Sequence, residues 1–283
     1  MIKIGRCYEL EVVKKVDFGF YLDAENLDTV LLPRKQAPDS LSVGDFIDVF
    51  LYLDSEDRAI ATTKTPKAKV GEFAYLNVVA INEVGAFLDW GLDKDILLPF
   101  GEQHRPLEVG HSYLVYIYLG KYDGRITATS KVDKILDYDK PHNFKAQQVV
   151  DLIIANSTEL GYKAIINHTH WGVLYKDEVH QRLSFGQYKK GYIKYIRPDG
   201  RIDLSLQGDQ ETRDKYARII LLYLRKQNGF APVHDKSDPQ LIADLFGMSK
   251  GAFKKAIGGL YKQKIITIEK DGICLVEKDF EKK

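Results

Sequence analysis

Hydrophobic and polar residues alternate along much of the first three quarters of the chain. In residues 8–12, apolar side chains are separated by glutamates, so that one face of the segment is apolar. A period of two residues is typical of a β-strand with one buried face. Residues 113–118 and 188–196 are rich in aromatic and β-branched side chains, which strands favour. The pattern predicts short strands from the N-terminus to about residue 212.

The strand pattern is organised as a repeat. Gly19 and Gly85 lie 66 positions apart, each inside a strand pattern, and a third, looser copy carries Gly161. A glycine inside a strand indicates a bulge or a sharp bend. Asp-Gly turn signals precede the last strand of the second and third copies. About five short strands per copy, closed on themselves, predict a small Greek-key barrel such as the OB-fold.

The last quarter changes to a period near 3.6 residues. Apolar positions between Tyr216 and Leu224 follow helical spacing, and Asn228 with the glycine after it ends this helix. Pro239 begins a second helix and Ser249 caps a third. Two apolar runs around an Asp-Gly turn then predict a β-hairpin. Three helices followed by a hairpin resemble a winged helix. We therefore expect a mostly β chain with a C-terminal α/β unit, in four domains: 1–66, 67–140, 141–212 and 213–283.

Composition excludes several classes of protein. The chain has 283 residues, of which 45% are hydrophobic and 29% charged, as in ordinary globular proteins. Its two cysteines, Cys7 and Cys274, exclude a disulfide framework and a cysteine-rich zinc site. The longest apolar run, residues 113–119, holds seven residues, far short of a membrane span. The N-terminus lacks a signal-peptide pattern, so we expect a cytoplasmic protein with no membrane partner.

Charge is spread unevenly along the chain. The net charge of +1 divides into −4, −2, +1 and +6 over the four predicted domains in chain order. This asymmetry indicates a polyanionic partner for the basic end. A lysine-rich helix face in contact with solvent explains the same charges equally well.

The order of landmarks in each copy resembles the S1 RNA-binding domain, an OB-fold barrel. Residues 18–21 read aromatic-Gly-x-aromatic, and an aliphatic pair, Val-Gly-Asp and a closing arginine segment follow. Copies one and two match well, whereas the third is degenerate. The resemblance implies that single-stranded RNA binds one barrel face, where two rings beside the glycine stack on bases. The histidine that the family has after its third strand is replaced here by Pro33, Pro99 and Tyr175.

Position by position, the resemblance implies RNA contacts in all three copies. The implied RNA-binding residues are Phe18, Phe20, Tyr21, Arg34, Arg58, Phe87, Lys121, Arg125, Tyr175, Arg197 and Arg201. Stacking of a base on an aromatic ring contributes about 1–3 kcal/mol and tolerates any base, whereas arginine and lysine follow the phosphates. The alternative is that these rings are ordinary partly buried packing, and for the third copy we favour that alternative.

The winged-helix segment adds a second set of implied contacts. Five lysines are placed to meet phosphates: Lys250, Lys254, Lys255, Lys262 and Lys264. The third helix has no arginine, and base-reading side chains are scarce, so we expect sequence-independent nucleic-acid contact or protein docking. Tandem S1-like barrels followed by this module resemble the conserved virulence factor B family. That resemblance implies a cytoplasmic RNA-binding protein that influences the expression of other genes and has no catalytic activity.

Catalytic and metal-binding motifs are missing from the sequence. It contains no phosphate-binding glycine loop and no nucleophile elbow. His168, His170 and His180 lack the partners that a metal site needs, so we expect no metal and no cofactor. The leading hypothesis is a regulatory protein that binds single-stranded RNA and is not an enzyme. The alternatives are a DNA-binding transcription regulator that uses the winged helix on duplex nucleic acid, and an adaptor that docks an RNA-processing or ribosomal protein.

Overall fold

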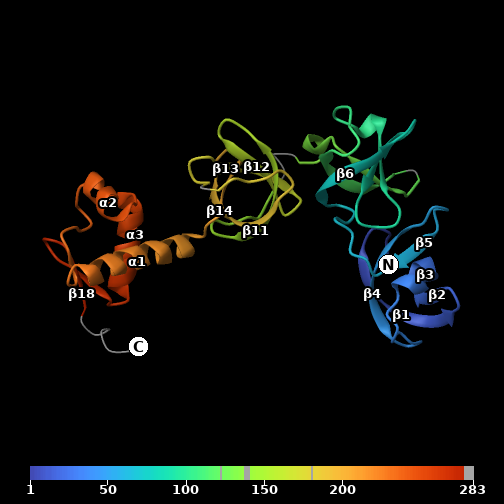
Figure 1. The fold of residues 1–283 in the computed structure, drawn as a ribbon, viewed down its shortest axis with the longest axis horizontal. Coiled ribbons are helices and arrows are strands. Elements are labelled where there is room, and N and C mark those ends of the chain that lie inside the picture. Colours follow the sequence, from blue (N-terminus) through green and yellow to red (C-terminus); the bar gives the residue numbers. More distant parts are fainter. Residues whose placement is uncertain (122, 137–140, 180, 277–283) are drawn as a thin grey trace. The chain divides into compact units, whose positions relative to one another are not determined.

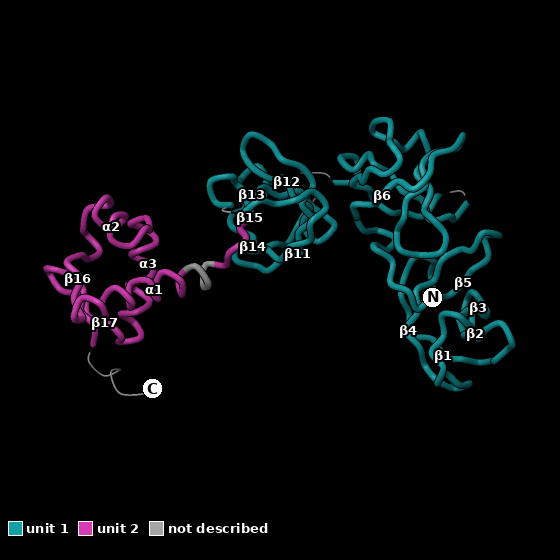
Figure 2. The backbone as a smooth tube through the Cα atoms, in the orientation of Figure 1, with its two compact units in different colours: residues 1–204 teal, residues 205–283 magenta. Residues whose placement is uncertain are grey.

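The computed structural model describes residues 1–121, 123–136, 141–179 and 181–276. The chain forms two compact units, residues 1–204 and 205–283 (Figure 2). The first unit contains three β-barrels, and the second contains the α-helices of the described residues (Figure 1). His180 lies outside the described residues.

Each barrel closes from five strands in the same order. In the first barrel, hydrogen-bonded neighbours run β1-β2-β3-β5-β4, and the pair that closes the barrel, β3 with β5, is parallel. The second and third barrels repeat this order, with parallel pairs β8–β10 and β13–β15.

The first barrel contains β1 (Cys7–Val16), β2 (Gly19–Asp23), β3 (Thr29–Pro33), β4 (Phe46–Leu53) and β5 (Ala59–Thr62). The second contains β6 (Phe73–Ile81), β7 (Gly85–Asp89), β8 (Ile96–Pro99), β9 (Ser112–Leu119) and β10 (Ile126–Thr129). The third contains β11 (Val149–Ser157), β12 (Gly161–Ile166), β13 (His170–Tyr175), β14 (Tyr188–Ile196) and β15 (Ile202–Ser205). Four short 3₁₀ helices accompany the barrels: Glu25–Leu27, Arg34–Gln36, Phe100–Glu102 and Val132–Lys134. The predicted tandem OB-type barrels are confirmed, including the degenerate third copy.

The repeated glycine opens the second strand of each barrel. A Cβ atom at Gly19, Gly85 or Gly161 would lie 2.2, 2.4 or 2.0 Å from a backbone carbonyl oxygen of the neighbouring strand. No side chain fits at that separation, so two strands meet here only because the residue is glycine. The bulge expected at these glycines lies instead in the preceding strand, for example between Val12 and Lys14. The glycine therefore allows close approach, and the bulge supplies the curvature.

Side chains of the strands alternate between the barrel interior and its outer surface. In the first barrel Phe20, Leu22 and Leu32 lie in the buried core. Tyr21 and Leu31, their neighbours in sequence, are only partly buried and belong to the outer face. The period of two thus decides which aromatic residues can meet a ligand.

The second unit is a winged helix. It contains α1 (Asp209–Lys226), β16 (Phe230–Ala231), α2 (Pro239–Phe246), α3 (Lys250–Lys262), β17 (Ile266–Ile268) and β18 (Ile273–Leu275). The Asp238 side chain accepts a hydrogen bond from the Gln240 N–H at the start of α2, and Ser249 accepts one from the Ala252 N–H at the start of α3. Gly247 ends α2 in the left-handed conformation. The predicted Ser249 cap and the predicted fold are both confirmed.

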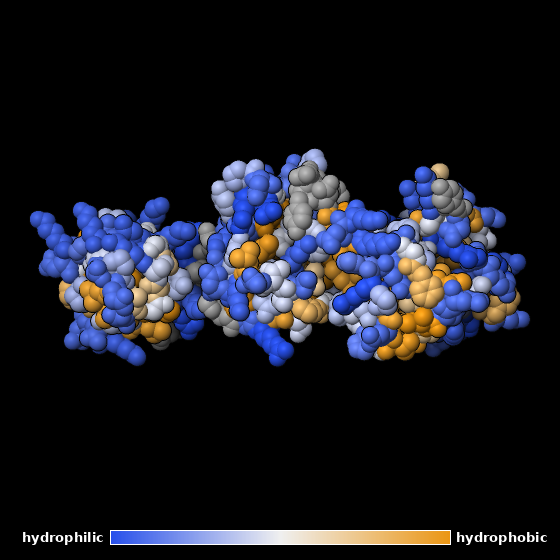
Figure 3. Space-filling view, turned by 90° about the horizontal axis from the view of Figure 1, so that it is seen from above, coloured by the Kyte–Doolittle hydropathy of each residue, from blue (hydrophilic) through white to orange (hydrophobic). Residues whose placement is uncertain are grey.

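Two properties of the described part of the chain bear on function. None of its helices is long and apolar enough to cross a membrane. The face drawn in Figure 3 is largely hydrophilic and is interrupted by hydrophobic patches. Phe18, Val84 and Phe100 are among the exposed large hydrophobic side chains.

Candidate nucleic-acid interface

The outer face of the first barrel carries a row of apolar side chains across three strands. Tyr21 on β2 pairs in register with Leu31 on β3, which pairs with Ile60 on β5. Phe18 precedes β2, and 60% of its side chain is exposed. The rings of Phe18 and Tyr21 meet edge to face, with centroids 6.5 Å apart. The turn before β2 and the register therefore place two predicted stacking residues side by side.

Phe20 does not belong to this face. Its side chain is 0% exposed and lies in the core of the first barrel. The Arg34 guanidinium and the Lys15 ammonium lie 5.5 and 5.7 Å from its ring centroid. The prediction that Phe20 contacts RNA is therefore wrong, because alternation along β2 turns it inward between Gly19 and Tyr21.

The cations of the first barrel are paired with carboxylates. The Arg58 guanidinium donates to Asp54 at 2.8–2.9 Å and lies 2.8 Å from Glu56. Desolvation opposes ionisation of Asp54, but hydrogen bonds from Arg58 outweigh it and lower the pKa of that carboxyl. Arg34 is exposed and lies 3.6 Å from Asp39. A phosphate would have to share these arginines with acidic neighbours.

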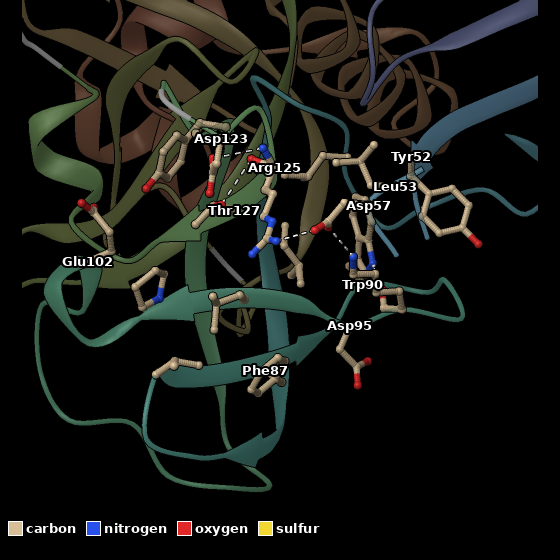
Figure 4. A pocket seen from close by; sticks show the side chains of 18 of the residues that line it. Tyr52, Leu53, Asp57, Phe87, Trp90, Asp95, Glu102, Asp123, Arg125 and Thr127 are labelled. Carbon is tan, nitrogen blue, oxygen red and sulfur yellow. Dashed lines mark hydrogen bonds and ion pairs between the residues drawn. The ribbon is translucent and has the colours of Figure 1, made fainter. Parts of the chain in front are cut away.

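A groove of about 740 Å³ runs along the outer face of the second barrel. Phe87 on β7, Leu97 on β8 and Thr127 on β10 form a row in register, and Tyr118 on β9 continues it. The first barrel supplies the far wall of this groove, from Tyr52 to Asp57 (Figure 4). We call this space the first groove. It is lined by Tyr52, Leu53, Ser55, Asp57, Val84, Phe87, Trp90, Lys94, Asp95, Ile96, Leu97, Pro99, Glu102, Tyr118, Gly120, Lys121, Asp123, Arg125, Ile126 and Thr127.

An ion pair crosses the first groove. The Arg125 guanidinium donates to the Asp57 carboxylate of the first barrel (Figure 4), and the Lys94 ammonium lies 3.4 Å from the same carboxylate. Desolvation raises the pKa of Asp57, but its contacts with Arg125 and Lys94 outweigh this and lower the pKa below its usual range. Lys121, also predicted, lines the groove and is exposed. The structure thus brings Phe87, Lys121 and Arg125 to one site.

Three predicted residues of the third barrel fall into two groups. The Arg197 Nε lies 3.0 Å from Asp203 Oδ1, and the Arg197 guanidinium also contacts the Tyr175 hydroxyl. Arg201 lies apart from this cluster, with Nε 3.7 Å from the Asp199 carboxylate. The cluster of Tyr175, Arg197 and Asp203 is partly buried. Contacts within the third barrel therefore hold Tyr175 and Arg197, whereas Arg201 is exposed.

The lysines of the winged helix lie on the side of α3 that faces away from its core. Phe253, Ala256, Ile257 and Leu260 point inward. Three predicted cations of the helix, Lys254, Lys255 and Lys262, are exposed on the other side, and Lys264, which follows the helix, is also exposed. Lys250 is half-buried and donates to the Lys236 carbonyl at 3.2 Å. Most of the predicted lysines are therefore available to an external anion.

Several residues of the first groove escaped prediction. Tyr118 belongs to an aromatic run that indicated only a strand, and the alternation that assigns it to the outer face is visible in the sequence. Asp57 and Tyr52 come from another barrel, and no local pattern connects them to Arg125. Among the described residues, no group of three histidines, cysteines or carboxylates could hold a metal ion.

Comparison with known families identifies the modules. The S1 domain family matches residues 4–64 and 70–131, and the CvfB-like winged helix domain family matches residues 218–275. The chain combines two S1 domains with a CvfB-like winged helix domain. Its third barrel has the same strand order but lies outside the segments that the S1 family matches.

Relatives span almost the whole of this tandem S1 chain. It is 29% identical over 272 residues to "Uncharacterized protein YitL" of Bacillus subtilis (strain 168), covering 91% of this chain and 89% of that protein. It is 28% identical over 290 aligned positions to "Conserved virulence factor B" of Staphylococcus aureus (strain USA300), covering 97% and 95%. A crystal structure of a multidomain protein with nucleic acid binding domains from Streptococcus pneumoniae aligns over 96% of this chain and 98% of that chain, at 24% identity and a TM-score of 0.41. The predicted resemblance to the conserved virulence factor B family is confirmed by the domain matches and the named relatives.

Proposed function

We propose that the chain binds single-stranded RNA on the outer faces of its S1 barrels and that the winged helix adds contacts to phosphates. The observation that carries the proposal is the in-register row of aromatic and aliphatic side chains on each S1-matched barrel. Phe18 and Tyr21 occupy this face in the first barrel, and Phe87 and Tyr118 occupy it in the second.

The chemistry of these faces suits unpaired bases. Aromatic side chains stack on any base because every base has a π-face, and the exposed Phe18 ring needs no rearrangement to do so. A double helix presents its phosphates and groove edges and keeps its bases stacked on one another. The first groove supports an extended strand because aromatic and charged side chains line it together.

The cations suit phosphate contacts of moderate strength. Arg58 and Arg125 already have carboxylate partners, so a phosphate replaces an existing ion pair at these positions. The exposed lysines of α3 offer contacts without a carboxylate partner among the described residues within ion-pair distance. This combination supports sequence-tolerant binding, through which the protein would act on gene expression in the cytoplasm, with no catalytic step.

The proposal is tested by fluorescence anisotropy on the full chain. A labelled oligouridylate of about 12 nucleotides is titrated at about 50 and 200 mM salt, next to a duplex DNA of the same length. We expect saturable RNA binding whose log K falls with log salt by about 0.7 for each phosphate neutralised. Absence of RNA binding at the lower salt would refute the proposal.

The exposed lysines of α3 support a second candidate, a regulator that binds duplex DNA. Tighter binding of the duplex than of RNA, lost in Lys254→Ala/Lys255→Ala, would favour it. An adaptor role would instead leave a protein complex that survives nuclease treatment, and RNA affinity would be unaffected by either lysine.

A further inference from the structure

A second groove, of about 360 Å³, lies between the second and third barrels. Its walls come from β6, β9 and the loop before β9 in the second barrel, and from β11, β12, β13 and the loop after β13 in the third. We call it the second groove. It is lined by Tyr75, His104, Arg105, Leu107, Ser112, Tyr113, Leu114, Ser130, Val132, Asp133, Ala155, Asn156, Lys163, Trp171 and Phe185. Its volume is at the lower end of the range for small-ligand sites, about 300–1,000 Å³.

Aromatic rings and cations meet in this groove. The Arg105 guanidinium lies 5.5 Å from the ring centroid of Tyr113 and is exposed. Within the described residues no carboxylate lies within ion-pair distance of Arg105, whereas Arg125 in the first groove is paired with Asp57. The Lys163 ammonium lies 3.7 Å from the ring centroid of Trp171 and 3.1 Å from Asp133, which it neutralises. Arg105 is thus the cation of this groove that is ready to receive an anion.

Trp171 presents an unsatisfied donor. Its side chain lines the groove but is only 4% exposed, and its Nε1–H has no hydrogen-bond acceptor among the described residues. A buried indole N–H without an acceptor is uncommon in folded proteins and calls for an explanation, such as an ordered water or a bound ligand. Carbonyl oxygens of nucleobases are acceptors of the required kind.

Phe185 supplies a ring at the rim. Its side chain is 47% exposed although it belongs to a loop that is packed tightly. The next residue, Gly186, has φ of +75°, and a Cβ atom there would lie 2.4 Å from the Cβ of Tyr75. The Gly186 N–H also donates to the Ile154 carbonyl at 2.7 Å. The loop backbone is therefore held between β11 of the third barrel and Tyr75 of the second, and this places Phe185 at the rim of the groove.

Strand β9 connects the two grooves. Its C-terminal part places Tyr118 in the first groove, and its N-terminal part places Ser112 to Leu114 in the second. Tyr113 and Tyr118 are five positions apart on this strand, which corresponds to roughly 17 Å at about 3.3 Å per residue. A single strand of RNA spans that distance with a few nucleotides, so one strand can reach both grooves.

We infer that the second groove is a nucleotide subsite for single-stranded RNA, in which a base meets Phe185 and the Trp171 N–H while its phosphate meets Arg105. This inference rests on the proposed function and extends it to the part of the second barrel that lines the groove with the third barrel. The ligand class follows from three groups that line the same groove: the Arg105 guanidinium, which has no carboxylate within ion-pair distance among the described residues, the exposed Phe185 ring, and the buried Trp171 N–H.

The two tryptophans of the chain provide the test, because Trp90 lines the first groove and Trp171 the second. In the full-length Trp90→Phe protein, tryptophan emission reports the second groove alone, and in Trp171→Phe it reports the first. Each is titrated with the oligouridylate while the anisotropy of the labelled RNA is followed in parallel. We expect the emission of Trp171 to change with the same midpoint as the anisotropy.

Surface variants make the result independent of the tryptophan substitutions. We expect Phe185→Ala to weaken RNA binding at least about 5-fold. Arg105→Ala should reduce the slope of log K against log salt by about 0.7. Tyr195→Ala and Arg182→Ala are the matched controls, since both residues are exposed in the third barrel and line neither groove. If RNA binds without changing Trp171 emission, and if Phe185→Ala and Arg105→Ala leave the affinity unchanged, the second groove is not a nucleotide subsite, whereas the proposed function stands. Absence of any RNA binding would overturn both.

Discussion

Phe18, in the turn before β2, and Phe20, on β2, should respond differently to substitution by alanine. Phe18 is 60% exposed, whereas Phe20 is 0% exposed and is among the largest fully buried side chains. Replacing a buried phenylalanine by alanine destabilises a protein by about 3–5 kcal/mol. Replacing an exposed side chain usually changes stability by no more than about 0.5 kcal/mol. The first barrel should therefore tolerate Phe18→Ala and lose most of its stability in Phe20→Ala.

RNA affinity separates the same two positions. Loss of one stacked base costs about 1–3 kcal/mol, which is roughly a 5- to 150-fold weaker complex. Phe18→Ala should show that loss with a fold that remains intact. Tyr21→Ala should weaken binding in the same range, because its ring lies 6.5 Å from that of Phe18.

The assay combines RNA anisotropy with amide hydrogen exchange of β1 to β5. Exchange is followed strand by strand because a chain of several domains does not unfold in one step. Phe18→Ala is expected to leave protection in these strands unchanged, and Phe20→Ala to reduce it. The reasoning is refuted if Phe18→Ala binds RNA like the wild type, or if it lowers protection as strongly as Phe20→Ala does.

Three further predictions concern the first groove, the repeated glycine and the junction of the second and third barrels. Asp57→Asn releases Arg125 from its ion pair, so the slope of log K for RNA against log salt should become steeper by about 0.7. Adding Arg125→Ala should abolish that increase. An unchanged slope in Asp57→Asn would argue against Arg125 as a phosphate ligand. Gly85→Ala places a Cβ 2.4 Å from the Leu98 carbonyl oxygen and should destabilise the second barrel by about 1–3 kcal/mol in chemical denaturation. Gly101→Ala, with no atom within 4 Å of its Cβ, is the control, and equal effects of the two would contradict the packing argument. His168 Nδ1 accepts from the Phe73 N–H at 2.9 Å, and burial lowers the pKa of His168 despite Glu72 and Asp151. Because the unfolded histidine, with a pKa of about 6.5, binds a proton more readily, stability should be complete above that pH and fall as the pH drops below it. Thermal unfolding from pH 8 to 5 measures this dependence, and a pH dependence that persists unchanged in His168→Gln would exclude the histidine as its source.

The sequence alone predicts the modules well because local chemistry determines them. A glycine is required wherever two strands approach as closely as they do at Gly19, Gly85 and Gly161, so its recurrence marks each barrel. Asp238 and Ser249 cap helices through hydrogen bonds to residues two or three positions away. Such short-range requirements leave a direct trace in the order of residues.

The site is predicted less completely because its contacts are long-range. Arg125 and Asp57 are 68 positions apart and belong to different barrels, so neither repeat nor period connects them. The second groove depends on how Phe185, Tyr113 and Trp171 come together from two barrels, which no motif in either barrel encodes. Phe20 is a different case. The motif match suggested a surface ring, and the alternation of inward and outward positions along β2 contained the correct answer.

Photo-crosslinking of the full chain to an oligouridylate that carries 4-thiouridine, followed by mass spectrometry of the linked peptides, tests the central claim most directly. A stacked base lies in van der Waals contact with its ring, so crosslinks should concentrate on the peptides that contain Phe18, Tyr21, Phe87 and Tyr118. Crosslinks confined to residues 213–276, with none on the outer faces of the first two barrels, would contradict the account.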